Sequence, residues 1–299
     1  MRDRFLSYSG DECWQHYIKR ETLEEDRQRY PSALIDNINI NDMEFSFVPK
    51  EDKKTCQEIK AFIERYEWLG KMPVWITHRF IATYQGVMVG AVIMATPNAF
   101  SNLLGKGNRK LEKLISRGAS ISFAPKNTAS WLIMKSIRWM VDNTEFRFFT
   151  AYADPLAGEL GTIYQACNFY YLGNNHGGGK MYKYKNVGWV GSSYFAQRST
   201  IKRIAIAHGV DWKPEYIKKN KTGSKRIIAW ENMDEETKSF IKAKVKEERE
   251  ACEFINSPPK HKYVYILSRN KIETNTLKII FRELNPDLVD LEYPKKRGE

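Results

Sequence analysis

The stretch "YADPLAGELGTIYQACNFYYLG", residues 152–173, decides the fold of this chain. An aromatic run from Phe146 to Tyr152 leads into it, an Asp-Pro step follows at 154–155, and a second aromatic run ends at Gly173. Aromatic runs bounded by proline and glycine are typical of strands, and the segment 157–168 between them has the character of a short helix. The stretch therefore predicts a strand–helix–strand corner with Asp154 at the end of its first strand.

The segments around this corner extend the pattern. Strands are predicted at 43–49, on both sides of the Tyr84-Gln85-Gly86 turn within 78–97, at 111–125, and late in the chain at 261–269. Helices are predicted at 50–70 and 126–143, the second with an Asn127/Thr128 start signal. We interpret the chain as an N-terminal helical arm (1–43), a core (44–185), a basic helical insertion (186–257) and a C-terminal strand and tail (258–299) that complete the core.

Charge is concentrated in one part of the chain. The net charge is +12, and residues 180–226 hold 12 Lys/Arg against only Asp211 and Glu215. Such a field attracts polyanions, and the aromatic residues interleaved with it favour nucleic acid, with a solvated lysine-rich surface as the alternative. Within this segment a helix from Ser199 to Gly209 and a second one from Pro214 would form a basic helix-turn-helix-like unit.

Composition restricts the class of protein. Hydrophobic residues make up 42% of the 299 residues, which is enough for a packed core. The four cysteines are scattered without a CxxC pair, no apolar run is long enough to span a membrane, and the N-terminus lacks a signal-peptide pattern. We expect a cytoplasmic protein without a membrane partner. The five histidines do not cluster, so no metal site is expected.

The strand order resembles the GNAT acyltransferase fold, an α+β fold with a mixed, mostly antiparallel central sheet flanked by helices. The motif LGTIYQACNF (160–169) is similar to a GNAT helix motif, and Tyr164 falls where that family places a hydroxyl near the leaving thiol. Asn168 stands where the family usually has glycine. GNAT proteins bind the coenzyme A pyrophosphate at the helix start after their fourth strand, and here that loop reads APKNTAS (124–130), without glycine.

A narrower resemblance rests on EWLG (67–70), ISRGASISFAPKNTAS (115–130), the opening stretch, HKYVYIL (261–267) and YPK (293–295). Together these are similar to the Mom family of bacteriophage DNA-modification proteins. The resemblance implies a transferase that adds a methylcarbamoyl-like, acyl-derived group to the exocyclic amine of adenine in double-stranded DNA and so protects phage DNA from restriction. A phage-encoded protein of this kind would act in the host cytoplasm. The group donor is unknown, with acetyl-CoA or another small acyl or glycyl donor as candidates.

The candidate site residues follow from these motifs. We expect catalytic roles for Asp154, Tyr164 and Glu67, because a carboxylate can accept a proton from an amine and a phenol can donate one to a leaving group. The structural alternatives are a helix cap for Asp154, core packing for Tyr164 and a surface position for Glu67. The cofactor-binding candidates are Arg117, Lys126, Asn127, Thr128 and Ser130. The substrate-binding candidates are Trp68, Tyr152, Asn168, Tyr170, Arg198, Lys202 and Arg203.

Two further functions are compatible with the sequence. One is a non-catalytic DNA-binding protein that uses the GNAT-like core as a scaffold and residues 186–257 as the reader. The other is a conventional N-acetyltransferase that depends on acetyl-CoA, against which the missing glycines of 124–130 argue.

Overall fold

The computed structural model describes residues 12–220, 223, 226–289 and 291–295. The chain divides into two compact units, of which the first comprises the residues up to Gly177 together with those from Pro258 onward. The second unit comprises Gly178–Ser257.

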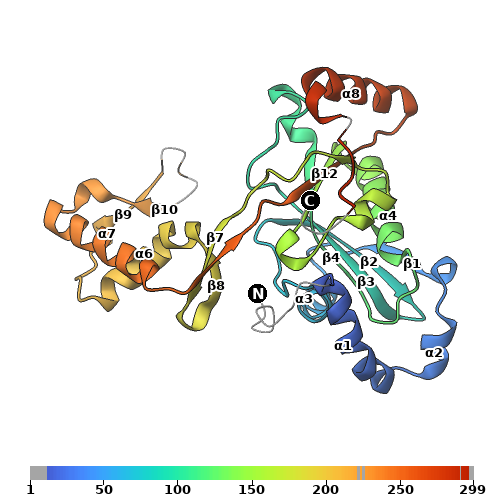
Figure 1. Cartoon of the computed structure of the whole chain (residues 1–299), viewed down its shortest axis with the longest axis horizontal. Helices are drawn as coiled ribbons and strands as arrows, with labels where there is room; N and C mark the ends of the chain where they lie inside the picture. Colours follow the sequence, from blue (N-terminus) through green and yellow to red (C-terminus); the bar gives the residue numbers. More distant parts are fainter. Residues whose placement is uncertain (1–11, 221–222, 224–225, 290, 296–299) are drawn as a thin grey trace. The chain divides into compact units, whose positions relative to one another are not determined.

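A seven-stranded sheet forms the centre of the first unit (Figure 1). Its strands follow the order β1 (Glu44–Phe47), β2 (Ile76–Tyr84), β3 (Val87–Ala95), β4 (Glu112–Ser120), β5 (Phe148–Ala153), β12 (His261–Ile266) and β6 (Tyr170–Tyr171). All neighbours are antiparallel except β4 and β5, which are parallel. The late strand β12 thus inserts between β5 and β6, and the expected GNAT-like, mostly antiparallel α+β fold is confirmed.

The β2–β3 hairpin shows why the sequence folds in this way. Gln85 and Gly86 join the strands with φ values of 49° and 78°, as a tight two-residue hairpin turn requires. Every residue of β3 from Val89 to Ala95 is buried, as expected for a central strand.

Helices cover this sheet. They are α3 (Lys53–Tyr66), α4 (Thr128–Asn143), the short α5 (Thr162–Ala166) and α8 (Lys271–Leu284). Helix α3 begins where the Asp52 side chain accepts the N–H of Thr55, and it buries Ile59 and Ile63 completely. No helix in the described ranges is long and apolar enough to cross a membrane.

The N-terminal helices α1 (Trp14–Arg29) and α2 (Ser32–Asn37) pack on this unit, while residues 1–11 of the predicted arm lie outside the described residues. Asp26 of α1 is fully buried and accepts three hydrogen bonds, from Arg65 Nη2 (2.8 Å), Tyr66 Oη (2.8 Å) and Ser122 Oγ (2.6 Å). A buried carboxylate is tolerated when it is paired and fully hydrogen-bonded, so Asp26 fixes α1 to α3 and to the end of β4.

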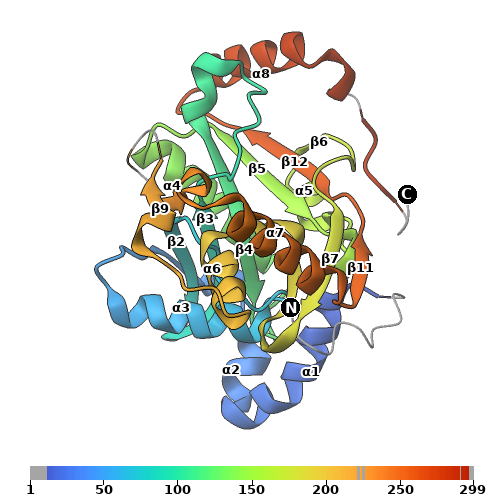
Figure 2. The same cartoon turned by 90° about the vertical axis from the view of Figure 1, so that its left-hand side faces the viewer.

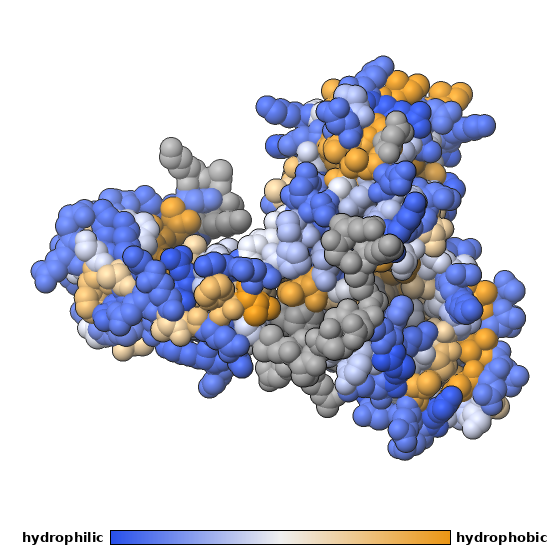
Figure 3. Space-filling view, viewed as in Figure 1, coloured by the Kyte–Doolittle hydropathy of each residue, from blue (hydrophilic) through white to orange (hydrophobic). Residues whose placement is uncertain are grey.

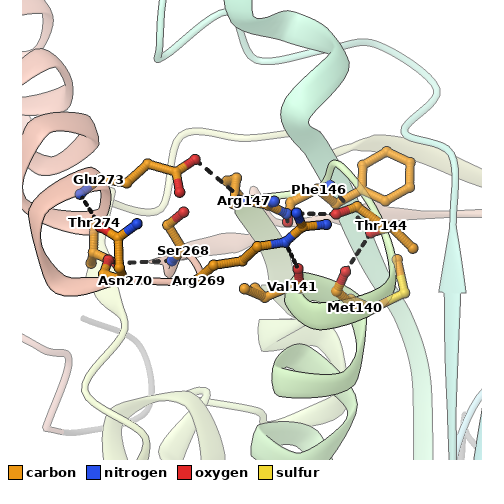
Figure 4. A network of polar contacts seen from close by, with 10 residues as sticks. All are labelled: Met140, Val141, Thr144, Phe146, Arg147, Ser268, Arg269, Asn270, Glu273 and Thr274. Carbon is orange, nitrogen blue, oxygen red and sulfur yellow. Dashed lines mark hydrogen bonds and ion pairs between the residues drawn. The ribbon is translucent and has the colours of Figure 1, made fainter.

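Helix α8 lies at the opposite end of the first unit from α1 (Figures 1 and 2). A polar network attaches it, in which Arg147 Nε is 3.5 Å from Glu273 Oε1 and Arg269 Nε donates to the Val141 carbonyl (3.2 Å; Figure 4). The Ser268 N–H donates to Thr274 Oγ1 (2.9 Å). Because these contacts join the end of α4 to the segments beside β12, they hold the late strand in place.

The second unit has its own sheet and core. Its strands β7 (Gly179–Tyr184), β8 (Gly188–Gly191) and β11 (Phe254–Ser257) pair in the order β11-β7-β8, and its helices are α6 (Arg198–Ala207) and α7 (Glu235–Glu250). The unit begins at Gly178, whereas the sequence interpretation placed the insertion at 186–257, because β7 pairs with β8 and β11.

The predicted second helix at Pro214 is wrong. Only a single 3₁₀ turn, Pro214–Tyr216, forms there, and the chain continues as β9 (Ile217–Lys219), which pairs with β10 (Arg226–Ile228). Pro214 starts this turn and not a helix, because the isoleucine-containing segments 217–219 and 226–228 pair as strands, which prevents a helix-turn-helix.

Candidate functional site

The candidate site lies where strands β4 and β5 separate. The two strands pair only from Glu112 to Ile115 and from Phe148 to Ala151, yet β4 runs on to Ser120 and β5 to Ala153. Beyond these pairs the facing strand edges are not hydrogen-bonded to each other. Side chains from the end of α3, from β4 and from the segment after β5 gather around this opening.

Asp154 immediately follows β5 and is buried. Its Oδ1 accepts the Leu156 N–H (3.0 Å), which caps the 3₁₀ turn Pro155–Ala157, and its Oδ2 lies 2.8 Å from Lys260 Nζ. The capping role considered from the sequence is therefore present, together with an ion pair that the sequence did not indicate. Because both oxygens are engaged, Asp154 is well placed to orient groups around it.

Glu159 lies beside Asp154 and was missed from the sequence. Its Oε2 accepts the backbone N–H of Asp154 (2.9 Å). Burial, reinforced by the charges of Glu67 and Asp154, raises the pKa of Glu159 to about 8, although the Asp154 N–H and Lys260 oppose the shift. A carboxyl group with this pKa exchanges its proton near neutral pH, which is the property of an acid–base catalyst. Its position in a glycine-flanked loop five residues after Asp154 was the signal available in the sequence.

Glu67 and Arg117 occupy neighbouring positions. Glu67 follows α3 and is buried, and its Oε2 accepts the Gly70 N–H (2.9 Å). Arg117 Nε lies 3.8 Å from Glu67 Oε1 and donates to the Lys71 carbonyl (2.9 Å), while its Nη1 donates to the Ser116 carbonyl (2.6 Å). Arg117 thus fixes the turn after α3 beside a carboxylate, and much of its donor capacity is already used.

Tyr164 of α5 lies within electrostatic range of these acids. Its ring packs against Phe169 and Tyr263, with centroids 5.3 and 5.4 Å away. Burial, followed by the charge of Glu159, raises the pKa of Tyr164 well above its usual range. The phenol therefore keeps its proton at neutral pH and can act as a hydrogen-bond or proton donor. Its hydroxyl has no hydrogen-bond partner among the residues the structure describes.

Tyr263 of β12 fixes the loop that carries Glu159. Its hydroxyl donates to the Leu160 carbonyl, and Gly161 approaches its ring so closely that a Cβ would lie 2.3 Å from Cε2. Gly161 also has φ +71°, so glycine is required there on two grounds. The late strand and Lys260 just before it therefore supply both the support for Glu159 and the cation beside Asp154.

The loop before α4 contains the other predicted cofactor residues. Asn127 precedes the helix with φ 68° and makes no side-chain cap, so the sequence correctly located the helix start but not the role of this residue. Asparagine tolerates this left-handed conformation better than other non-glycine residues, which is how the turn forms without glycine. Thr128 is buried and donates to the Pro125 carbonyl, and Ser130 Oγ donates to the Asn127 carbonyl.

The start of α4 presents groups of the kind that bind anions. Lys126 and Asn127 are accessible there, and the first N–H groups of a 16-residue helix favour negative charge. Lys19 of α1 adds a third polar side chain, because its Nζ donates to the Ala124 carbonyl (3.1 Å), and burial lowers the pKa of Lys19. The hydroxyls of Thr128 and Ser130 already donate hydrogen bonds within the loop. Lys126 and the backbone N–H groups are therefore the main groups available to bind an acyl-group donor.

The predicted substrate-binding residues are dispersed. Trp68 is buried in a cluster with Trp14 and Ile18 of α1, and Tyr170 packs on Phe281 of α8 (centroids 5.2 Å apart), so these two rings serve packing. Tyr152 is 37% exposed on β5, with the His176 ring 6.3 Å away and Lys262 Nζ 5.8 Å from its centroid.

Asn168 and the three residues of α6 are accessible. Asn168 is exposed and has φ 58°, a backbone conformation that glycine adopts most readily. Arg198, Lys202 and Arg203 line a hollow of about 350 Å³ on α6. Arg203 is engaged internally, because its Nη2 donates to Tyr194 Oη (2.5 Å). Among the described residues no group of three His, Cys, Asp or Glu side chains could hold a metal ion.

The chain is similar to proteins of known family and structure. A model of the Mom protein family matches residues 55–281. No curated protein matches the chain. Among solved structures, yncA from Salmonella typhimurium, determined with its cofactor acetyl-CoA, is 12% identical with a TM-score of 0.32, and the match covers 49% of this chain and 84% of that one.

An N-acetyltransferase from Staphylococcus aureus Mu50 is 16% identical with a TM-score of 0.28, covering 57% of this chain and 88% of that one. These TM-scores are too low to support a conclusion about function. The fold is assigned from the order of the strands in the sheet.

Proposed function

This chain is a member of the Mom protein family, and on that basis we propose that it is a phage-type, GNAT-like transferase that modifies DNA. The proposed reaction adds a small acyl-derived, methylcarbamoyl-like group to the exocyclic amine of adenine. Its proposed role is to protect the modified DNA from restriction.

The observation that carries this proposal is the group of three carboxyl side chains, Glu67, Asp154 and Glu159, at the separation of β4 and β5. The Glu159 carboxyl accepts the backbone N–H of Asp154 (2.9 Å), and the charges of Glu67 and Asp154 act on Glu159. Burial and these charges raise the pKa of Glu159 to about 8, so this carboxyl mostly holds its proton at neutral pH. A carboxyl that titrates near neutral pH can transfer a proton, whereas a purely structural role would not require such a pKa.

An exocyclic adenine amine needs this help. Its lone pair is delocalised into the ring, so the nitrogen becomes an effective nucleophile only as its proton is removed. In the proposed step the nitrogen forms a bond to the transferred carbon, and its proton passes to the carboxylate form of Glu159. Asp154, held by Lys260, fixes the backbone N–H that orients Glu159. Only roughly a tenth of Glu159 is ionised at pH 7 if its pKa is about 8, so the step accelerates as the pH rises.

Tyr164 is suited to the other half of the reaction. As the bond between the transferred carbon and the leaving group breaks, the leaving group departs with the electron pair. Tyr164 keeps its proton because its pKa is raised, and it can donate a hydrogen bond that stabilises the negative charge on the leaving group, which takes its proton from solvent. Glu159, protonated in the first half, then releases its proton to solvent.

The start of α4 is the proposed donor site. A bound acyl or glycyl donor, such as acetyl-CoA, would supply the electrophilic carbon. Lys126 and the first N–H groups of α4 would hold its anionic part, and Lys19 would add charge on the adjoining side of the loop.

DNA is the proposed substrate because residues 180–226 carry a net charge of +10. An adenine amine must leave the base stack before the carboxyl groups of the candidate site can reach it, and the exposed Tyr152 offers a ring against which a displaced base can stack.

Mass spectrometry of nucleosides from DNA co-expressed with the protein tests the function. We expect a modified deoxyadenosine with the wild type and its loss with Asp154→Ala. Unmodified adenine in the presence of folded protein contradicts the proposal. If Asp154→Asn and Tyr164→Phe leave all biological activity intact, the non-catalytic DNA-binding alternative is correct. Tight acetyl-CoA binding without DNA binding instead identifies a conventional acetyltransferase.

A further inference from the structure

A two-stranded ribbon occupies the place where the sequence predicted a second basic helix. Strands β9 and β10 pair in antiparallel fashion, with Ile228 opposite Ile217 and Arg226 opposite Lys219. Ile228 is buried and packs with Ile201 of α6 and Tyr216 in the core of the second unit. The inner end of the ribbon is thus anchored, and Lys219 and Arg226 form its outermost described pair.

This outermost pair brings two cations directly opposite each other. Like charges at opposed positions of an antiparallel pair are destabilising. Lys219 and Arg226 are both exposed, and neither has a hydrogen-bonding or ion-pairing side chain among the described residues. The neighbouring Lys218, in contrast, forms an ion pair with Glu231. The fold therefore leaves two adjacent positive charges for which the described part of this unit provides no counter-charge.

The charge of the second unit is also unevenly distributed along its sequence. Residues 180–226, which include the ribbon and α6, carry a net charge of +10, whereas residues 227–257 carry a net charge of −3. The side of this unit seen in Figure 3 is mainly hydrophilic. A polyanion is attracted to the basic part of such a unit.

We propose that the β9–β10 ribbon is a contact surface for double-stranded DNA, in which Lys219 and Arg226 bind neighbouring backbone phosphates. The major groove admits a two-stranded ribbon, and lysine and arginine contacts to phosphate fix the position of a protein on the duplex. The phosphates would supply the missing counter-charge. This inference rests on DNA being the substrate, and it assigns a DNA-binding element that does not depend on the carboxyl groups of the candidate site.

Duplex binding measured by fluorescence anisotropy over a series of salt concentrations tests the ribbon. The variant K219Q/R226Q removes the opposed cations. The matched control K238Q/K244Q removes two cations of α7 that are already paired, with Glu235 and Glu247. Both variants have the same net charge, so general electrostatic attraction is equal in the two.

We expect K219Q/R226Q to bind a labelled duplex on the order of tenfold more weakly at low salt, with a log–log salt slope less negative by about 2. The control should stay close to the wild type in both respects. Wild-type affinity and slope in K219Q/R226Q would overturn the inference, and so would a wild type that binds no duplex. Ribbon-dependent binding of poly-L-glutamate without duplex binding would identify an acidic protein as the partner instead.

Nucleoside mass spectrometry separates this inference from the proposed reaction. Modified adenine combined with normal duplex binding by K219Q/R226Q retains the transferase and rejects the ribbon. Unmodified adenine combined with ribbon-dependent duplex binding retains the ribbon and rejects the transferase.

Discussion

Lys260, the residue before β12, places its Nζ 2.8 Å from Oδ2 of Asp154 at the end of β5. This contact joins two segments separated by about a hundred residues of sequence, one of which returns to the sheet only after the second unit. It makes the C-terminal segment part of the candidate site.

Removing this cation should lower the stability of the fold. Lys260→Met leaves the buried Asp154 carboxylate without its ion-pair partner, and we expect a loss of about 1–3 kcal/mol, since the lysine itself is partly exposed. The exposed pair Lys246–Glu250 provides the control, because Lys246→Met should change stability by less than about 0.5 kcal/mol. Urea denaturation of the wild type and the two variants measures these differences in the free energy of unfolding. Equal effects of the two substitutions would show that Lys260 does not hold Asp154.

Glu159→Gln should separate stability from activity. The folded-state pKa of Glu159, about 8, exceeds its ordinary value, so the folded state loses stability as the pH rises from about 4.5 through 8. Glutamine keeps an oxygen for the Asp154 N–H but cannot ionise, so at pH 8 the variant should be more stable by about 1–3 kcal/mol while losing activity. Thermal unfolding at pH 5 and pH 8 measures the difference, which should be largest at pH 8. A variant that stays active would exclude Glu159 as the base.

Lys113 should lower stability at neutral pH without contributing to the reaction. It is almost fully buried, its Nζ lies 3.2 Å from Thr77 Oγ1 and 3.9 Å from the centroid of the Phe146 ring, and burial lowers its pKa to about 8. The unfolded chain therefore binds the proton more tightly, and wild-type stability should rise with pH between about 8 and 10.5.

Lys113→Met should accordingly add about 1–3 kcal/mol at pH 7 and remove this pH dependence, which urea denaturation at pH 7 and pH 10 measures. Lys135→Met, on the exposed part of α4, is the control and should change little. A loss of stability in Lys113→Met would mean that the contacts with Thr77 and Phe146 outweigh the cost of burying the charge.

Asn168 offers a test of whether its side chain or its backbone matters. The backbone at Asn168 has φ 58°, which glycine adopts without strain and valine does not. Asn168→Gly should therefore fold at least as well as the wild type, while Asn168→Val should lose about 1–2 kcal/mol of stability. Thermal unfolding measures both changes. Full activity in Asn168→Gly would restrict this residue to a backbone role. A folded but inactive glycine variant would support the predicted contact between its amide and the substrate.

The sequence predicted local features well and long-range ones poorly. The apolar β3 strand, the Gln85-Gly86 turn and Asp154 at the end of β5 follow from local pattern, so the GNAT-like sheet was predictable. The proximity of Lys260 to Asp154 depends on β12 inserting between β5 and β6, which no local pattern encodes. Glu159 resembled an ordinary loop acid because its raised pKa arises from burial and from the Glu67 and Asp154 charges.

The helix predicted from Pro214 failed for a related reason. A proline at a first helical position is a real start signal, but it carries no information about the conformation of the residues after it. Ile217 and Ile228 pair across the ribbon, and Ile228 reaches the core of the second unit, so tertiary packing decided in favour of strands.

Intact-nucleoside mass spectrometry of DNA from cells that express the wild type, Asp154→Ala or Glu159→Gln tests most directly whether this chain modifies adenine. We expect a deoxyadenosine carrying a small added group with the wild type and its absence with either variant, at equal levels of folded protein. Unmodified adenine with the wild type, or equal modification by all three proteins, would contradict this expectation.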